Sequence, residues 1–183
     1  MHNLYPDWCP TRKPVPPRSR LYHLAPVGVG TEHVESLTGY VTRLAAAHAV
    51  SVSKLIGYEI GPKAIRPKVG PQSATRAQGR VVPLTYSQSY ILNASGCAAQ
   101  NWVLQLGDLT GQKELRFLTT LCWSGAVSGE ELVRWHRAWC PQCYQRWRNS
   151  GETVRELLLW ALRPVSMCAV HQRQLETRCW NCG

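Results

Sequence analysis

Two pairs of metal-ligating side chains lie in the last third of the sequence. Cys140 and Cys143 belong to a Cys-Pro-Gln-Cys segment, Cys168 and His171 to a Cys-Ala-Val-His segment, and 24 residues separate the two. A CxxC turn can point two thiolates at one metal ion, and a second turn of the same size completes a tetrahedron, for which Cys and His suit Zn²⁺. The spacing therefore predicts one closed, structural zinc site that stabilises a region with few aliphatic side chains.

Two other interpretations of these residues compete with a zinc site. The cysteines could be ordinary core residues, or Cys140 and Cys143 could form a redox pair. A redox motif is expected to open a helix beside a strand. Here the motif lies between aromatic and basic segments that begin at Trp135 and end at Trp147, so we favour zinc.

A further CxxC pair, Cys179 and Cys182, is followed by no second pair before the sequence stops at Gly183. Half of a zinc finger is not stable without its other half. We expect that the natural chain continues and completes a second finger. The alternative is that one of the remaining cysteines completes the site: Cys9, Cys97 or Cys122.

The composition is that of a basic globular protein. The 183 residues are 44% hydrophobic, and 21 Lys and Arg against 11 Asp and Glu give a net charge of +10. Such a charge favours nucleic acid or an acidic protein surface without choosing between them. No apolar run is long enough to span a membrane, and residues 1–20 lack the apolar core of a signal peptide. Cysteines with metal-type spacing and no export signal indicate a reducing, cytoplasmic compartment.

Residues 1–30 are predicted to form an extended arm, because their many prolines prevent regular structure. Leu4, Tyr5 and Trp8 either pack on the arm's own domain or dock on a partner, where aromatic anchors contribute most of the binding energy. The arm also carries candidates for nucleic-acid contact: Arg12, Lys13, Arg18 and Arg20.

Residues 61–90 are predicted to be a basic connector rich in Pro and Gly. It is either a solvated loop, which we favour, or a strap that contacts phosphates. Its candidates for nucleic-acid contact are Arg66, Lys68, Arg76 and Arg80.

The chain between and beyond these segments is predicted to be mainly α. Residues 31–60 fit a helix-turn-helix, with Ser36 and Ser51 as N-caps of its two helices. Arg43 and Lys54 are its few basic groups expected to be exposed, which favours packing or protein docking over base reading. Residues 91–138 form a helical region and residues 139–183 a zinc-finger region. Further helices are expected after Gly96 to about Gly107, over 115–122 with Cys122 in the core, over 130–137 and over 152–162.

Catalytic motifs are missing from the sequence, which contains no phosphate-binding loop, no GxSxG and no HExxH. His33 and Glu35 resemble part of a zinc deaminase signature, but their distance from Cys140 and the proline inside the Cys pair depart from it. We therefore expect no enzymatic activity.

The order of these segments resembles the TniQ family. The resemblance covers most of residues 21–183, and its most specific part is the series CPxC, CxxH, CxxC; the last pair of ligands of a second finger is missing. The matching positions are Gly30-Thr31 through Ile56 with Glu35-Ser36-Leu37, Tyr40, Arg43-Leu44-Ala45 and Ser51, the run Leu109-Thr110-Gly111, Leu115-Arg116 and Leu118-Thr119, and finally Trp139 through Cys143, Trp160, Cys168 through Gln172, Leu175 and Cys179 through Cys182.

The resemblance implies a role as a target selector in transposition. Family members recruit an AAA+ ATPase, TnsC, either from an attachment site in DNA or, in CRISPR-associated transposons, from a Cascade-type effector with its guide RNA. The resemblance thus implies a non-enzymatic adaptor in the bacterial cytoplasm, associated with the nucleoid when engaged. Whether it forms a homodimer stays open. The alternative function is a stand-alone, sequence-specific DNA-binding regulator of transcription.

Overall fold

The structure is a computed structural model that describes residues 18–60, 86–127 and 132–179. The described chain is mainly helical and contains no β-strand, only four isolated bridges. Its elements, in order, are α1 (Leu37–Ala47), α2 (Val52–Lys54), the π-helix η1 (Leu55–Ile60), the 3-10 helix η2 (Tyr86–Asn93), α4 (Cys97–Thr110), the 3-10 helices η3 (Leu115–Leu118) and η4 (Thr120–Trp123), α5 (Pro141–Ser150) and α6 (Leu158–Ala161). The predicted mainly α class is confirmed, and none of these helices is long and apolar enough to cross a membrane.

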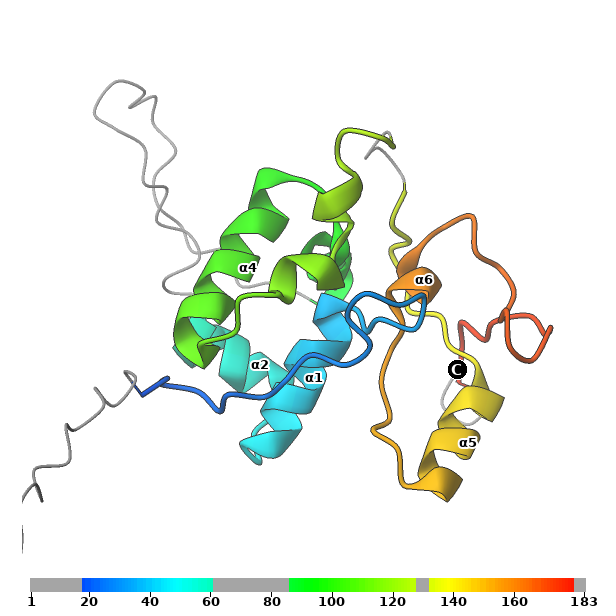
Figure 1. Ribbon diagram of the computed structural model, residues 1–183, viewed down its shortest axis with the longest axis horizontal. Helices are drawn as coiled ribbons and strands as arrows, with labels where there is room; N and C mark the ends of the chain where they lie inside the picture. The colour runs from blue at the N-terminus through cyan, green and yellow to red at the C-terminus, as the bar shows by residue number, and fades with distance from the viewer. Residues whose placement is uncertain (1–17, 61–85, 128–131, 180–183) are drawn as a thin grey trace, which may run out of the picture.

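The described elements form two lobes, which lie side by side in Figure 1. The helical lobe comprises residues 18–60 and 86–127, and its core is built mostly from leucines of α1, η1, α4 and η3 around Tyr40. The cysteine lobe comprises residues 132–179. Its smaller core contains three cysteines and two tryptophans, Trp147 and Trp160.

Serine caps position the first two helices as the sequence predicts. Ser36 Oγ accepts a hydrogen bond from Gly39 N at 3.1 Å, and Ser51 Oγ accepts one from Lys54 N at 3.3 Å. The turn between the helices closes with Ala49 at φ 53°, a left-handed conformation that is uncommon outside glycine.

Three other helix predictions are wrong. Residues 115–122 form two 3-10 helices instead of one α-helix, because Thr119 is extended between them, and Cys122 is exposed instead of lying in the core. Residues 132–137 are not helical: Arg134 N donates to Ala161 O at 2.9 Å. Of residues 152–162, only α6 is helical.

The segment before α6 fails to form a helix because its backbone pairs with the helical lobe. Ser36 N donates to Glu156 O at 2.7 Å, and Leu158 N donates to Val34 O at 2.8 Å. The Glu156 carboxylate also forms an ion pair with Arg137. The two backbone hydrogen bonds join the lobes beside α6 (Figure 1), and the ion pair lies within the cysteine lobe.

Candidate metal centre

The four predicted ligands come from two turns that the fold brings together. Cys140 is the N-cap of α5, and Pro141 starts the helix, where its missing N–H leaves no hydrogen bond unmade. Cys168 and His171 lie on a tight turn, in which Cys168 N donates to Arg173 O and Gln172 N donates to Cys168 O, both at 2.8 Å.

A pair of backbone hydrogen bonds holds the two turns next to each other. Trp139 N donates to Glu176 O at 3.0 Å, and Glu176 N donates to Trp139 O at 2.8 Å. This antiparallel bridge fixes the residue before the CxxC segment against the chain that leaves the second turn.

The resulting geometry fits a tetrahedral metal. All four ligand atoms lie within 4.8 Å of one another. His171 Nδ1 is 3.5 Å from Cys140 Sγ, 3.3 Å from Cys143 Sγ and 3.7 Å from Cys168 Sγ, and Cys143 Sγ is 3.6 Å from Cys168 Sγ. Ideal Zn–S and Zn–N bonds give tetrahedron edges of about 3.8 Å between sulfurs and about 3.5 Å between sulfur and nitrogen. This buried Cys₃His group could therefore hold a metal ion.

The electrostatics of the group differ between the two turns. Burial, followed by a hydrogen bond to Cys168 and the neighbouring Cys140, raises the pKa of Cys143. Burial acts in the same direction on Cys168, but the backbone N–H groups of His171 and Val170 donate to its sulfur, and the net effect lowers its pKa. A bound cation would deprotonate all three thiols, and the turn at Cys168 already favours the thiolate.

The surroundings of the CxxC segment correct one part of the sequence argument. The segment does open a helix, α5, whereas its flanking sequence predicts that it does not. No strand precedes it in the described chain. Instead, Cys168 and His171 face the pair, which fits metal binding better than dithiol exchange.

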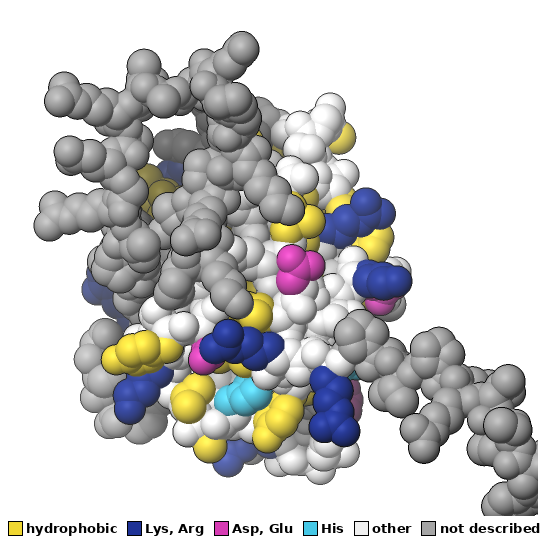
Figure 2. Space-filling view, turned by 90° about the vertical axis from the view of Figure 1, so that its left-hand side faces the viewer, with side chains coloured by type: hydrophobic (Ala, Val, Ile, Leu, Met, Phe, Trp, Pro, Cys, Tyr) yellow, Lys and Arg dark blue, Asp and Glu magenta, His cyan; other side chains and the backbone are white. Residues whose placement is uncertain are grey.

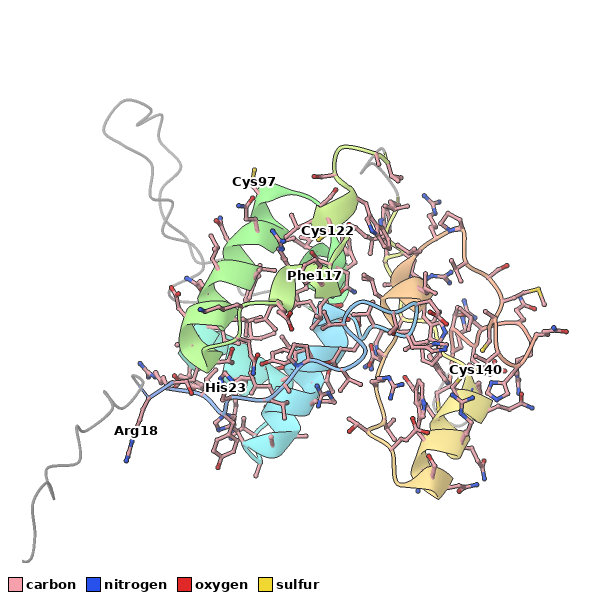
Figure 3. The ribbon with its side chains drawn as sticks, viewed as in Figure 1. Arg18, His23, Cys97, Phe117, Cys122 and Cys140 are labelled. Carbon is pink, nitrogen blue, oxygen red and sulfur yellow. The ribbon has the colours of Figure 1, made fainter. Side chains whose placement is uncertain are left out.

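The second predicted pair is described only in part. Cys179 is half-buried, and Cys182 lies outside the described residues. Cys97 and Cys122 are exposed on the helical lobe, whereas Cys140 lies in the other lobe (Figure 3). The Cys₃His group that could hold a metal ion in the described chain contains neither of the two, and Cys9 is not described.

Most of the predicted partner and nucleic-acid residues lie outside the described residues. Those described are Arg18, which is exposed, and Arg20, whose Nε lies 2.8 Å from Glu59 Oε2. The positions that are not described are Leu4, Tyr5, Trp8, Arg12, Lys13, Arg66, Lys68, Arg76 and Arg80.

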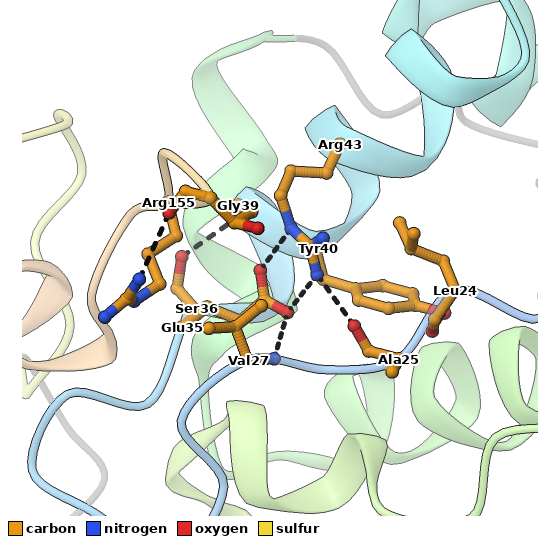
Figure 4. Close-up of polar contacts among 10 residues, drawn as sticks. Leu24, Ala25, Val27, Glu35, Ser36, Gly39, Tyr40, Arg43 and Arg155 are labelled. Atoms are coloured by element: carbon orange, nitrogen blue, oxygen red, sulfur yellow. Dashed lines mark hydrogen bonds and ion pairs between the residues drawn. The ribbon is translucent and has the colours of Figure 1, made fainter. Parts of the chain in front are cut away.

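Sequence reasoning missed a buried ion pair beside the lobe contact (Figure 4). Glu35 is fully buried and accepts Arg43 Nε at 2.8 Å, Arg43 Nη2 at 2.6 Å and Val27 N at 2.8 Å. The prediction that Arg43 is exposed is therefore wrong, since its side chain is only 16% exposed. The sequence does not indicate this ion pair, because its two residues are eight positions apart and Glu35 precedes α1, so they share no helical spacing.

The described chain is thus a mainly helical protein with a Cys₃His group that could hold a metal ion. The sequence model of the TniQ family matches residues 26–175, which is most of the chain. The chain belongs to the TniQ family, whose role lies in transposition. No curated protein matches the chain.

Proposed function

We propose that this protein is a targeting adaptor in transposition, without chemistry of its own, that links a target-recognition complex to a TnsC-type AAA+ ATPase. The family match over residues 26–175 carries this proposal. The Cys₃His group supports it, because a metal held by four protein ligands has no open position for a substrate or an activated water.

The metal in the proposed adaptor is Zn²⁺, held by Cys140, Cys143, Cys168 and His171. Three buried cysteines and a histidine at tetrahedral distances match the ligand set of structural zinc. Cys179 and Cys182 would supply half of a second site. The zinc-finger region would comprise residues 139–183, and the helical region before it, predicted at 91–138, has no helix over 132–137.

Residues 31–60 of the proposed adaptor form a helix-turn-helix that docks on protein instead of reading bases. Ion pairing removes Arg43 from its surface, which leaves Lys54 as the basic side chain of its second helix. Around the turn, Tyr22, Val50 and Tyr58 are 59%, 40% and 78% exposed. Figure 2 shows hydrophobic side chains lying among basic ones on this side of the molecule.

The arm at residues 1–30 and the connector at 61–90 are the other proposed contact segments. Leu4, Tyr5 and Trp8 would anchor the ATPase or the effector, because aromatic side chains dominate interface energies. The basic residues of both segments would meet phosphates of target DNA or guide RNA, Arg20 only after leaving its ion pair with Glu59. The targeting cue would be attachment-site DNA or a Cascade-type effector.

Capture of the ATPase tests the proposal. The tagged full chain is incubated with the TnsC-type ATPase from the same transposon and ATP, with and without the target complex. We expect ATPase retention that weakens when Leu4, Tyr5 and Trp8 are replaced together by Ala. Phe117→Ala serves as control, since Phe117 is an exposed aromatic of the helical lobe. A protein that binds a specific duplex but never retains the ATPase would instead be a stand-alone regulator.

A further inference from the structure

One face of α5 carries side chains of the types that read DNA bases. Positions three or four apart on a helix share a face, and the polar positions of α5 follow this spacing. The buried residues of α5, Cys143 and Trp147, lie on the opposite side. The residues of this face, called the α5 face below, are Gln142, Gln145, Arg146 and Asn149, and all four are exposed.

The side chains of the α5 face are available for a ligand. None of the four forms a hydrogen bond or ion pair with another residue of the described chain, whereas Arg43, Arg137 and Arg173 each pair with a glutamate. The sequence of α5, PQCYQRWRNS, contains no acidic residue. The face lines an open depression together with His171 and Arg173.

The charge around the α5 face favours an anionic ligand. Within residues 132–179 there are three glutamates, no aspartate and no lysine. The basic residues of this lobe are all arginines: Arg134, Arg137, Arg146, Arg148, Arg155, Arg163, Arg173 and Arg178. Arginine is the residue type best suited to bidentate recognition of phosphates and guanine.

The chemistry of the face matches the major groove of duplex DNA. That groove is about 12 Å wide and admits an α-helix, in which Arg pairs with guanine and Asn or Gln with adenine through two hydrogen bonds. The major groove of duplex RNA is too deep and narrow for side chains to read. The metal group fixes the start of α5, because Cys140 and Cys143 flank its first turn, and a recognition helix needs such a rigid mounting.

We propose that α5 is a recognition helix that enters the DNA major groove and reads base edges with Arg146, Gln145 and Asn149. This inference rests on the proposed function for its target DNA and assigns the contact to the cysteine lobe, not to the helix-turn-helix. Arg148, at the flank of the face, would contact the phosphate backbone.

Selection from a random-sequence duplex library with the zinc-loaded full chain, followed by fluorescence anisotropy, tests the inference. We expect Arg146→Gln to weaken binding to the selected duplex roughly tenfold or more, as the loss of one bidentate base contact does, and to relax the preference at one guanine. Arg116→Gln, which removes the same charge from the helical lobe, should leave binding nearly unchanged. Both variants should keep the metal content and Tm of the wild type, because neither residue is a ligand.

Four results would overturn the inference. The full chain fails to bind duplex DNA at low salt, or Arg146→Gln and Arg116→Gln weaken DNA binding equally. Duplex RNA competes as well as duplex DNA does, or Arg146→Gln loses ATPase capture without losing DNA binding. The last result would assign the α5 face to a protein partner. ATPase capture by the wild type is measured separately, so the adaptor function can stand when the recognition helix fails.

Discussion

Replacing Cys143 by Ser should unfold the cysteine lobe and leave the helical lobe folded. Cys143 is 1% exposed, and its sulfur lies 3.3 Å from His171 Nδ1 and 3.6 Å from Cys168 Sγ. The substitution removes one ligand of the closed set and leaves a hydroxyl, which is a poor ligand for zinc beside two thiolates.

The expected loss is large because the metal would contribute about as much as the small apolar core of the cysteine lobe. Apart from the ligands, its buried core contains Trp147, Trp160, Leu157, Leu175 and Ala138. Full burial of such apolar side chains contributes about 1.5–3 kcal/mol each, whereas structural zinc contributes roughly 10–16 kcal/mol of apparent binding energy. The lobe should therefore unfold without the metal, while the helical lobe keeps its own leucine-rich core.

Metal analysis and hydrogen exchange measure this separation. For Cys143→Ser we expect loss of zinc and fast amide exchange over residues 132–179, with α1 and α4 still protected. Cys122→Ser is the matched control, since Cys122 is exposed and lies outside the metal group. In a cobalt-substituted sample, the wild type should show the spectrum of a tetrahedral thiolate site, and Cys143→Ser should not. Full zinc content and unchanged protection in Cys143→Ser would refute the reasoning.

Three further predictions concern the helical lobe and its contact with the cysteine lobe. Glu35→Gln should lower the free energy of unfolding by about 3–5 kcal/mol in urea denaturation, because it leaves a buried guanidinium without its counter-charge; a loss below about 1 kcal/mol would contradict this. Gly39→Ala should lower the free energy of unfolding by about 1–3 kcal/mol in the same urea denaturation, since the added Cβ would lie 3.1–3.2 Å from atoms of Glu156. The control Gly57→Ala, whose added Cβ has nothing within 4 Å, should raise it by about 0.5–1 kcal/mol. Equal effects of the two substitutions would argue against the close contact between Gly39 and Glu156. Burial raises the pKa of Tyr40 above its ordinary 10.0. The contribution of this shift to stability is therefore complete below pH 10.0 and is lost as the pH rises through the folded-state pKa. Tyr40→Phe should remove this alkaline loss of stability in thermal melts, and an unchanged loss would show that other groups cause it.

Local signals explain the parts of the fold that the sequence predicts well. Ser36 and Ser51 precede apolar stripes, and each caps its helix through a bond to a residue three positions on. The clustering of the four Cys and His side chains is predicted equally well, because each pair lies within one turn and only the meeting of the two turns is non-local.

Non-local hydrogen bonds account for the main errors. Residues 152–162 are predicted to be one helix, yet Glu156 O accepts from Ser36 N, 120 positions earlier in the chain. Arg134 donates from its guanidinium to the carbonyl of Leu162 at 2.8 Å. Such tertiary hydrogen bonds override local helix propensity, and no periodic pattern of residues in the sequence indicates them.

The same non-local bonds bear on how an adaptor of this kind could work. Glu156 touches the helical lobe through its backbone carbonyl and through its packing against Gly39, and its carboxylate pairs with Arg137, three residues before Cys140. One residue thus ties α1 to the segment that leads into the metal group and α5. Since protein interiors are close-packed and transmit displacement, the orientation of α5 should be fixed relative to α1. If α5 lies in the DNA groove, the position of the helical lobe on the target follows from this contact, and the lobe can present a partner surface at a defined place along the DNA.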